Sequence, residues 1–173
     1  SPTSACTGPT DTAGTVCTLE IAAFERTGNP VVDGTVANVV SSCGGVGQSG
    51  DNGSTGSCVF GAESFGRCEV EWVAPENMIS PTVCPDGSNV RVLAYTLGEE
   101  DFDDVNGNGY FERGEFDPDK DDKGEAFLDL NDDDVLNGLE SFFVDWNNSG
   151  AREEKTGLKS DPSSPAHYNG TAC

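Results

Sequence analysis

The clearest chemical pattern in this sequence is the stretch from Asp104 to Glu115, which reads DVNGNGYFERGE. Oxygen-bearing side chains stand at its first, third, fifth, ninth and twelfth positions, and glycine stands at the sixth, where a cation-binding loop turns sharply. Alternate residues of such a loop point inward, and the spacing matches the calcium-loop template at every fixed position. The predicted ligands are Asp104, Asn106, Asn108, the Tyr110 carbonyl, Glu112 and Glu115.

Two further stretches repeat this pattern, and a fourth is less regular. In the second, Asp134 replaces the glycine at the sixth position, and aspartate tolerates left-handed backbone better than most residues do. In the third, Thr156 stands at the twelfth position, which predicts a site that is weaker or that uses Glu154 instead. The predicted ligands are Asp129, Asn131, Asp133, the Val135 carbonyl, Asn137 and Glu140 in the second stretch; Asp145, Asn147, Ser149, the Ala151 carbonyl and Glu153 in the third; and Asp117, Asp119, Asp121 and Glu125 in the fourth.

These stretches predict two to four bound calcium ions in EF-hand-like loops without paired helices. The sequence Phe-Asp-Pro-Asp that follows the first loop is a poor start for a helix. The alternative is a solvated acidic segment without fixed structure, because residues 99–154 carry 20 of the 31 acidic residues and only four of the nine basic ones. Fixed spacing, glycines at turn positions and interleaved aromatic residues favour ordered loops. We expect Phe102, Phe127, Phe142 and Phe143 to pack the loops onto the rest of the protein.

The net charge of −22 excludes several function classes. Nothing basic is available to displace counterions from a nucleic-acid backbone or to bind an anionic membrane, and no apolar run is long enough to span a bilayer. The nucleophile-elbow motif G-x-S-x-G and the zinc motif H-E-x-x-H are both missing. The single histidine, His167, lies in SPAHYNG, which is typical of a surface turn. We therefore expect no enzyme and no catalytic residue.

Seven cysteines stand at positions 6, 17, 43, 58, 68, 84 and 173. Without a CxxC pair, they indicate up to three disulfides in an oxidising compartment and one cysteine left over. Short loops close easily, which favours Cys6–Cys17 and Cys58–Cys68, although many arrangements remain open. Ser1 is interpreted as the start of a mature chain from which a targeting segment was removed, so we expect an extracellular or cell-surface location.

The loops must be positioned by a scaffold, and the first half of the chain predicts strands. Cys17 to Ala23 and Arg67 to Ala74 alternate between apolar and polar residues, and Val36–Val40 and Val90–Leu97 are further candidates. The stretch 41–57 is rich in glycine and serine and predicts a loop or a hairpin with long connections. Short strands between Gly- and Pro-rich turns indicate an all-β antiparallel sandwich with little helix.

Four regions follow from this pattern. They are residues 1–16, an N-terminal segment that could act as a donor or inter-subunit strand; residues 17–98, the sandwich; residues 99–157, the acidic loop array packed on it; and residues 158–173, a C-terminal segment.

Several stretches resemble the bacterial immunoglobulin-like domains of surface proteins of the invasin and intimin type. NPVVDGTVANVVSS resembles a strand pair of these domains and GRCEVEWVAP one of their strands, while VRVLAYTLGEEDFDDVNGNG, GEAFLDLNDDD and YNGTAC resemble an acidic extension found in one branch. The resemblance covers about Cys17 to Cys173. It implies an Ig-like β-sandwich that is secreted or surface-exposed and acts in adhesion or structure.

Two functional hypotheses follow. The first is a calcium-stabilised structural subunit of an extracellular filament or surface assembly, which associates with copies of itself by adding an N-terminal strand to a neighbour. The second is a calcium-dependent adhesion module displayed on a bacterial surface, whose target the sequence does not identify. A calcium-buffering matrix protein is a third, weaker hypothesis.

Overall fold

A computed structural model of the chain describes residues 3–7, 14–47, 55–77, 84, 89–96, 98, 101–112, 114–117, 120–138, 140, 142–145 and 148–152, with backbone alone for residues 3–7 and 55. These residues form strands, turns and extended segments. None of them is helical, so the described part of the chain contains no helix that could cross a membrane. The strands are β1 (Thr3–Thr7), β2 (Val16–Ala22), β3 (Val36–Ser41), β4 (Gly45–Gly47), β5 (Thr55–Val59), β6 (Arg67–Val73) and β7 (Val92–Tyr95). The all-β prediction is confirmed.

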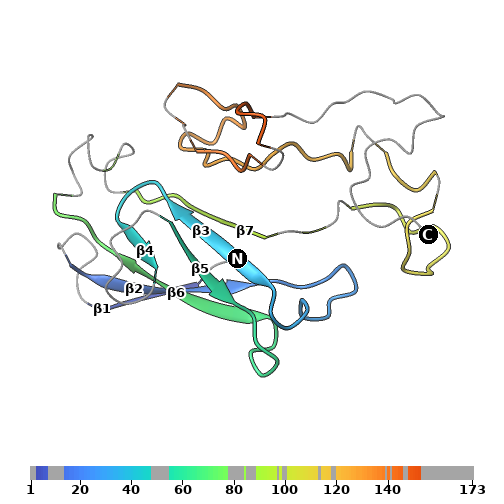
Figure 1. Cartoon of the computed structure of the whole chain (residues 1–173), viewed down its shortest axis with the longest axis horizontal. Coiled ribbons are helices and arrows are strands. Elements are labelled where there is room, and N and C mark those ends of the chain that lie inside the picture. The colour runs from blue at the N-terminus through green and yellow to red at the C-terminus, as the bar shows by residue number, and fades with distance from the viewer. Residues whose placement is uncertain are drawn as a thin grey trace. The chain divides into compact units, whose positions relative to one another are not determined.

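The strands form two antiparallel sheets, as expected for a β-sandwich (Figure 1). One sheet has the order β1-β2-β6-β4 and the other has the order β5-β3-β7. The predicted alternation holds in the two longest strands, where Leu19 of β2 lies opposite Val70 of β6 and both side chains are buried. Period-two burial of this kind places one face of a sheet against the core and leaves the other in water.

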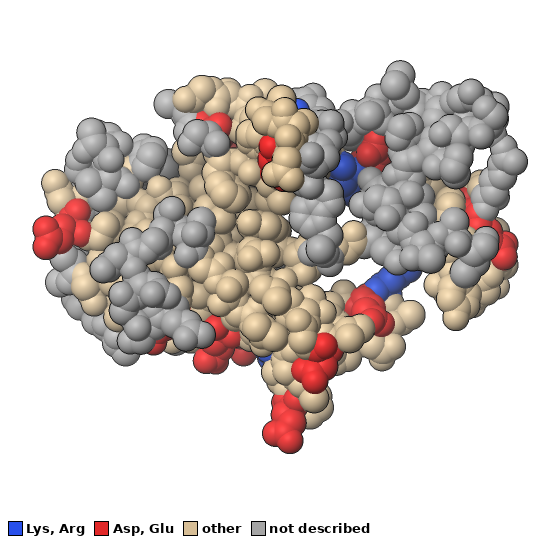
Figure 2. All heavy atoms as spheres, in the orientation of Figure 1, with Lys and Arg blue, Asp and Glu red and all other residues tan. Residues whose placement is uncertain are grey.

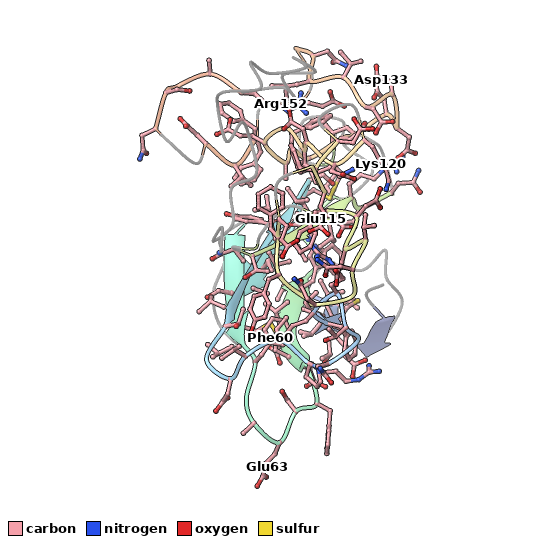
Figure 3. All side chains as sticks on the ribbon, turned by 90° about the vertical axis from the view of Figure 1, so that its right-hand side faces the viewer. Phe60, Glu63, Glu115, Lys120, Asp133 and Arg152 are labelled. Carbon is pink, nitrogen blue, oxygen red and sulfur yellow. A yellow bond between two sulfur atoms is a disulfide. The ribbon has the colours of Figure 1, made fainter. Side chains whose placement is uncertain are left out.

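The core between the two sheets draws on both of them. Phe60, which follows β5, is 1% exposed and lies among the strands in Figure 3, while Val39 of β3 and Val46 of β4 are completely buried. Trp72 of β6 donates a buried hydrogen bond from Nε1 to the carbonyl of Cys43 at 2.9 Å. The indole therefore joins β6 to the turn between β3 and β4.

Replacing Trp72 with phenylalanine keeps an aromatic ring in the core but removes this donor. The Cys43 carbonyl is then left without its partner, so we expect the free energy of unfolding to fall by about 1–3 kcal/mol. Urea denaturation followed by circular dichroism measures the change. A midpoint equal to that of the wild type would show that the hydrogen bond contributes nothing.

Strand β4 and the start of β5 lie in the Gly- and Ser-rich stretch that was expected to be a loop or hairpin. The register places Val46 opposite Trp72, so β4 extends the first sheet by one short strand. A Cβ atom on Gly56 of β5 would lie 2.7 Å from the Cα atom of Gly47. Glycine is needed here because the two sheets approach each other closely, and a strand built from glycine carries no hydrophobic alternation.

Two disulfides join described cysteines of the sandwich to each other. Cys58–Cys68 joins β5 to β6, which confirms one of the predicted pairs, and Cys43–Cys84 joins the β3–β4 turn to the chain before β7. Cys17 is also disulfide-bonded, and its Cα atom lies opposite that of Cys6 in the β1–β2 register. The side chain of Cys6 and all of Cys173 lie outside the described residues.

The N-terminal segment, expected as a possible donor strand, contributes β1, which pairs along its whole length with β2 of its own chain. Exchange of this strand between subunits stays a prediction.

The chain divides into two compact units, one formed by Ser1–Thr96 with Phe127–Phe142 and the other by Leu97–Ala126 with Phe143–Cys173. The first break lies close to the boundary predicted at residue 98. The second predicted loop, however, belongs to the sandwich unit and not with the other acidic loops.

Candidate metal centre

We call Asp104–Glu115 loop 1, Asp129–Glu140 loop 2 and the stretch that begins at Asp145 loop 3. In loop 1 the carboxylate of Asp104, at the first position, organises the turn. Its Oδ1 accepts hydrogen bonds from the backbone N–H groups of Gly107 at 2.7 Å and Asn108 at 3.1 Å, and its Oδ2 accepts one from Gly109 at 2.8 Å. The fourth, fifth and sixth residues are therefore folded around one acidic side chain.

The carboxylate of Glu115, at the twelfth position, closes the same loop. Its Oε1 accepts from the N–H group of Val105 at 3.0 Å and its Oε2 from that of Glu112 at 2.8 Å, and the side chain is buried. An ionised carboxylate offers about four acceptor positions on its two oxygens. Both oxygens of Glu115 can therefore take part in these bonds and still accept a cation.

Loop 2 repeats most of this arrangement, but its first carboxylate accepts from the third residue, Asn131, at 3.1 Å, where that of loop 1 accepts from the fifth. Asp129 accepts from the fourth residue, Asp132, at 2.7 Å through Oδ1 and from the sixth, Asp134, at 3.0 Å through Oδ2. Glu140 accepts from the second residue at 2.8 Å through Oε1 and from the ninth at 3.1 Å through Oε2, and it too is buried. Two segments with different sequences therefore share one hydrogen-bond scheme.

Loop 3 shares the first part of the scheme. The two oxygens of Asp145 accept from the N–H groups of Ser149 at 2.9 Å and Gly150 at 2.8 Å, the fifth and sixth residues. The hydroxyl of Ser149 donates to the carbonyl of Ala151 at 2.8 Å, so two predicted ligands lie in contact. The other predicted ligands of this loop, Asn147 and Glu153, lie outside the described residues.

The backbone of all three loops turns in the same way. The fourth and sixth residues have positive φ in each loop, a conformation that glycine, asparagine and aspartate adopt most easily. The residues and angles are Gly107 (73°) and Gly109 (79°), Asp132 (60°) and Asp134 (59°), and Asn148 (57°) and Gly150 (79°). Asp134 therefore takes the left-handed conformation that its place in the pattern requires.

The amide side chains of loop 1 face the acid at the ninth position. The amide nitrogens of Asn106 and Asn108 donate to the two carboxylate oxygens of Glu112 at 2.8 and 3.1 Å. The amide oxygen of Asn106 accepts from the N–H group of Asn108 at 2.9 Å, and that of Asn108 accepts from Tyr110 at 2.8 Å. The third, fifth and ninth residues of the loop are thus held together.

Loop 2 brings three carboxylates together. One oxygen from each of Asp129, Asp133 and Glu140 lies within 4.8 Å of the others, and among the described residues this is the only group of three acidic, histidine or cysteine side chains so placed. The donors are all oxygen atoms, which are the ligands that calcium takes, and neither a thiolate nor an imidazole stands among them for a softer metal. The residues present fit a hard divalent cation.

The Asp129 carboxylate is stabilised in its charged form. Burial by itself would raise its pKa, but the backbone N–H groups of Asp134, Asp132, Asn131 and Asp133 outweigh this and hold the pKa of Asp129 below its ordinary value. Its contribution to folding is therefore present above the ordinary pKa of aspartate and is lost as the pH falls through the lower folded-state pKa.

The fourth predicted group has a different geometry. Asp121 is buried and its Oδ2 accepts from the N–H group of Asp117 at 2.9 Å, while the backbone carbonyl of Glu125 accepts from Arg152 at 2.8 Å. The ammonium of Lys120 lies 2.7 Å from Asp103 and 3.7 Å from Asp121. The hydrogen bond and charge of Asp103 raise the pKa of Lys120. This part of the chain therefore carries its own cation, and Asp119 lies outside the described residues.

Sequence reasoning missed the contacts that anchor loop 2. Arg91 donates from Nη1 to Oδ1 of Asp132 at 2.7 Å, and the ring of Tyr95 lies 6.3 Å from that of Phe142. Of the aromatic residues expected to pack the loops, Phe142 thus packs on β7. Phe102 instead lies edge-on to Phe111, within the second unit.

No protein-family model matches the chain, and neither a curated protein nor a solved structure matches it.

Proposed function

We propose that this chain is a calcium-stabilised extracellular structural protein, a subunit of a filament or surface assembly built on an Ig-like sandwich with EF-hand-like loops. The observation that carries the proposal is the hydrogen-bond scheme shared by loops 1 and 2. In each, the first and twelfth residues bind backbone N–H groups through both carboxylate oxygens. Flexible coordination by six to eight oxygens is typical of calcium, whereas magnesium demands near-ideal octahedral geometry.

The disulfides support the extracellular location, and the net charge gives bound calcium a role in assembly. Disulfides persist in oxidising compartments, which favours an extracellular location. Carboxylates are spread over the described surface on the face shown in Figure 2, with few basic groups among them. Because a net charge of −22 opposes self-association, bound calcium would lower the repulsion between copies as well as within each one.

The calcium part of the proposal is tested by replacing one twelfth-position acid at a time. Glu115→Gln and Glu140→Gln each remove one charged ligand, so each variant should bind one calcium ion fewer, or bind it at least tenfold more weakly. Isothermal titration calorimetry measures both quantities. Glu71→Gln, on the solvent side of β6, makes the same charge change outside the loops and should leave binding unchanged. If the wild type and the three variants bind calcium with the same stoichiometry and affinity, the assignment of the loops as calcium sites is wrong.

The assembly part is tested on the wild-type protein. Sedimentation velocity and negative-stain microscopy in millimolar calcium should show polymers that dissociate when a chelator is added. If the protein is a monomer both in calcium and in chelator, the calcium-dependent adhesion module is favoured over the assembly subunit.

One observation favours that second candidate. Three large apolar side chains are exposed on the connections that follow β2 and β5, namely Phe24, Val32 and Phe65, the last of which is 76% exposed. The backbone N–H group of Ala23 donates to the carbonyl of Gly66 at 2.9 Å and so ties the two connections together. Phe65 also has a positive φ of 51°, a strained conformation for an aromatic residue. Binding residues are found disproportionately on loops that a rigid scaffold positions, so these exposed side chains support a binding role for the two connections.

A further inference from the structure

The sheet β5-β3-β7 is buried only in part on the face that points away from the core, around Val40, whereas Val36 and Val59 on the same face are 42% and 59% exposed. Ala37 and Val39 of β3 belong to the core between the two sheets, but Val40 is only 3% exposed without belonging to that core. Adjacent residues of a strand point to opposite faces, so Val40 is buried on the face that points away from the core. We call this the outer face of β3 and β7; it carries Val40, Leu93 and Tyr95, because Val40 lies opposite Leu93 in the register.

The segment Phe127–Phe142, which contains loop 2, contacts this outer face at two points. The ring of Phe142 packs against the ring of Tyr95, and the carboxylate of Asp132 forms an ion pair with Arg91, just before β7. Leu128 is buried without belonging to the core, and its N–H group donates to the carbonyl of Phe142 at 3.0 Å, which closes the base of the segment. All of these residues belong to the sandwich unit.

The two contact points lie next to the predicted ligands in the chain. Asp132 stands between Asn131 and Asp133, and Phe142 follows two residues after Glu140. With no cation present, the carboxylates of Asp129, Asp133 and Glu140 repel one another across less than 5 Å, and repulsion of this kind loosens the loop. A cation that binds all three would remove that repulsion and fix both contact points at once.

We propose that a divalent cation in loop 2 holds the segment Phe127–Phe142 against the outer face of β3 and β7, and that losing the cation uncovers this face. The inference rests on calcium binding to loop 2, as proposed above. The inference gives the two loops separate roles. Loop 2 holds the segment Phe127–Phe142 on the sheet, whereas loop 1 acts within the other unit. An uncovered edge strand with apolar neighbours is a site where chains associate, so calcium would also control access to β7.

Hydrogen exchange measured by mass spectrometry, in calcium and in chelator, tests the coupling. In the wild type, calcium should slow amide exchange in β7 at least tenfold, because closing the cover suppresses local opening of this edge strand. Glu140→Gln should abolish this effect. Glu115→Gln is the matched control, with the same chemical change in loop 1, and should keep the slowing in β7 while losing it in residues 101–117. In chelator, the wild type and Glu115→Gln should exchange alike in β7, and Glu140→Gln should exchange no faster than they do, because it removes one of the repelling charges. Such a result shows that the variants fold.

The outcomes separate this inference from the proposed function. If calorimetry shows a calcium site that Glu140→Gln removes, but calcium leaves exchange in β7 unchanged, the cover is not coupled to the ion and the inference is wrong. If no calcium binds to loop 2 in the wild type, the proposed function itself fails for that loop.

The calcium affinity of loop 2 gives a second test, because calcium binding and the contact with the sheet are thermodynamically linked. Coupling between two sites is reciprocal, so weakening the contact with the sheet must weaken calcium binding in loop 2. Phe142→Ala should lower the affinity of loop 2 about three- to tenfold and leave that of loop 1 unchanged. An equal loss in both loops, or in neither, contradicts the coupling.

Discussion

Free calcium at about one hundred times the dissociation constant is expected to stabilise the protein by about 2.7 kcal/mol for each occupied loop, because the ion binds the folded loop and not the unfolded chain. For compact units of this size, that corresponds to an increase of roughly 10–20 °C in the melting temperature of the unit that holds the site. Differential scanning calorimetry in calcium and in chelator measures the shift. Loops 1 and 2 lie in different compact units, so each unit should show its own increase.

The variants already described are the controls for this prediction. Glu115→Gln should remove the calcium-dependent increase of the unit that contains loop 1, and Glu140→Gln that of the sandwich unit. Magnesium at the same concentration should produce a smaller increase, because it gives up its bound water reluctantly and demands octahedral geometry. Melting temperatures that are the same in calcium and in chelator would contradict the stabilising role of the ion.

Removing the disulfide Cys43–Cys84 is expected to lower the free energy of unfolding by about 4 kcal/mol, on the chain-entropy estimate for a loop of this length. The two cysteines are 41 residues apart, both are buried, and their Cα atoms are 5.0 Å apart. The bond limits the freedom of the unfolded chain between the β3–β4 turn and β7. The double variant Cys43→Ala and Cys84→Ala, unfolded in urea, measures the loss.

Cys58–Cys68 is the matched comparison. This bond spans only 10 residues, so the same estimate gives a smaller loss of about 2.7 kcal/mol for Cys58→Ala with Cys68→Ala. The order of the two effects is the discriminating result. A larger loss for the short loop would show that native contacts around Cys58 and Cys68, and not chain entropy, determine the stabilisation.

The features that could be predicted from the sequence are those encoded by neighbouring residues. The alternation in β2 and β6 is local, so both strands and their buried faces were found to within one residue. The short separation of Cys58 and Cys68 favoured their pairing. By contrast, β4 consists of Gly-Val-Gly and is defined by backbone pairing with β6, which leaves no pattern of side chains to recognise.

The candidate site also has some features that local spacing predicts and others that depend on contacts between distant residues. The spacing of acids, amides and glycines within a loop located loops 1 and 2, and the left-handed conformation of Asp134 follows from its position in the pattern. The contact of Arg91 with Asp132 joins residues 41 positions apart, and that of Tyr95 with Phe142 is similarly distant. Neither could be found from local spacing, so the place of loop 2 in the sandwich unit became visible only in the structure.

The most direct test of the calcium assignment is a crystal structure determined in millimolar calcium, with anomalous diffraction measured at a long wavelength where calcium scatters anomalously. We predict one anomalous peak inside loop 1 and one inside loop 2, the latter about 2.3–2.6 Å from carboxylate oxygens of Asp129, Asp133 and Glu140. Well-ordered loops with no anomalous peak at either position would contradict the account.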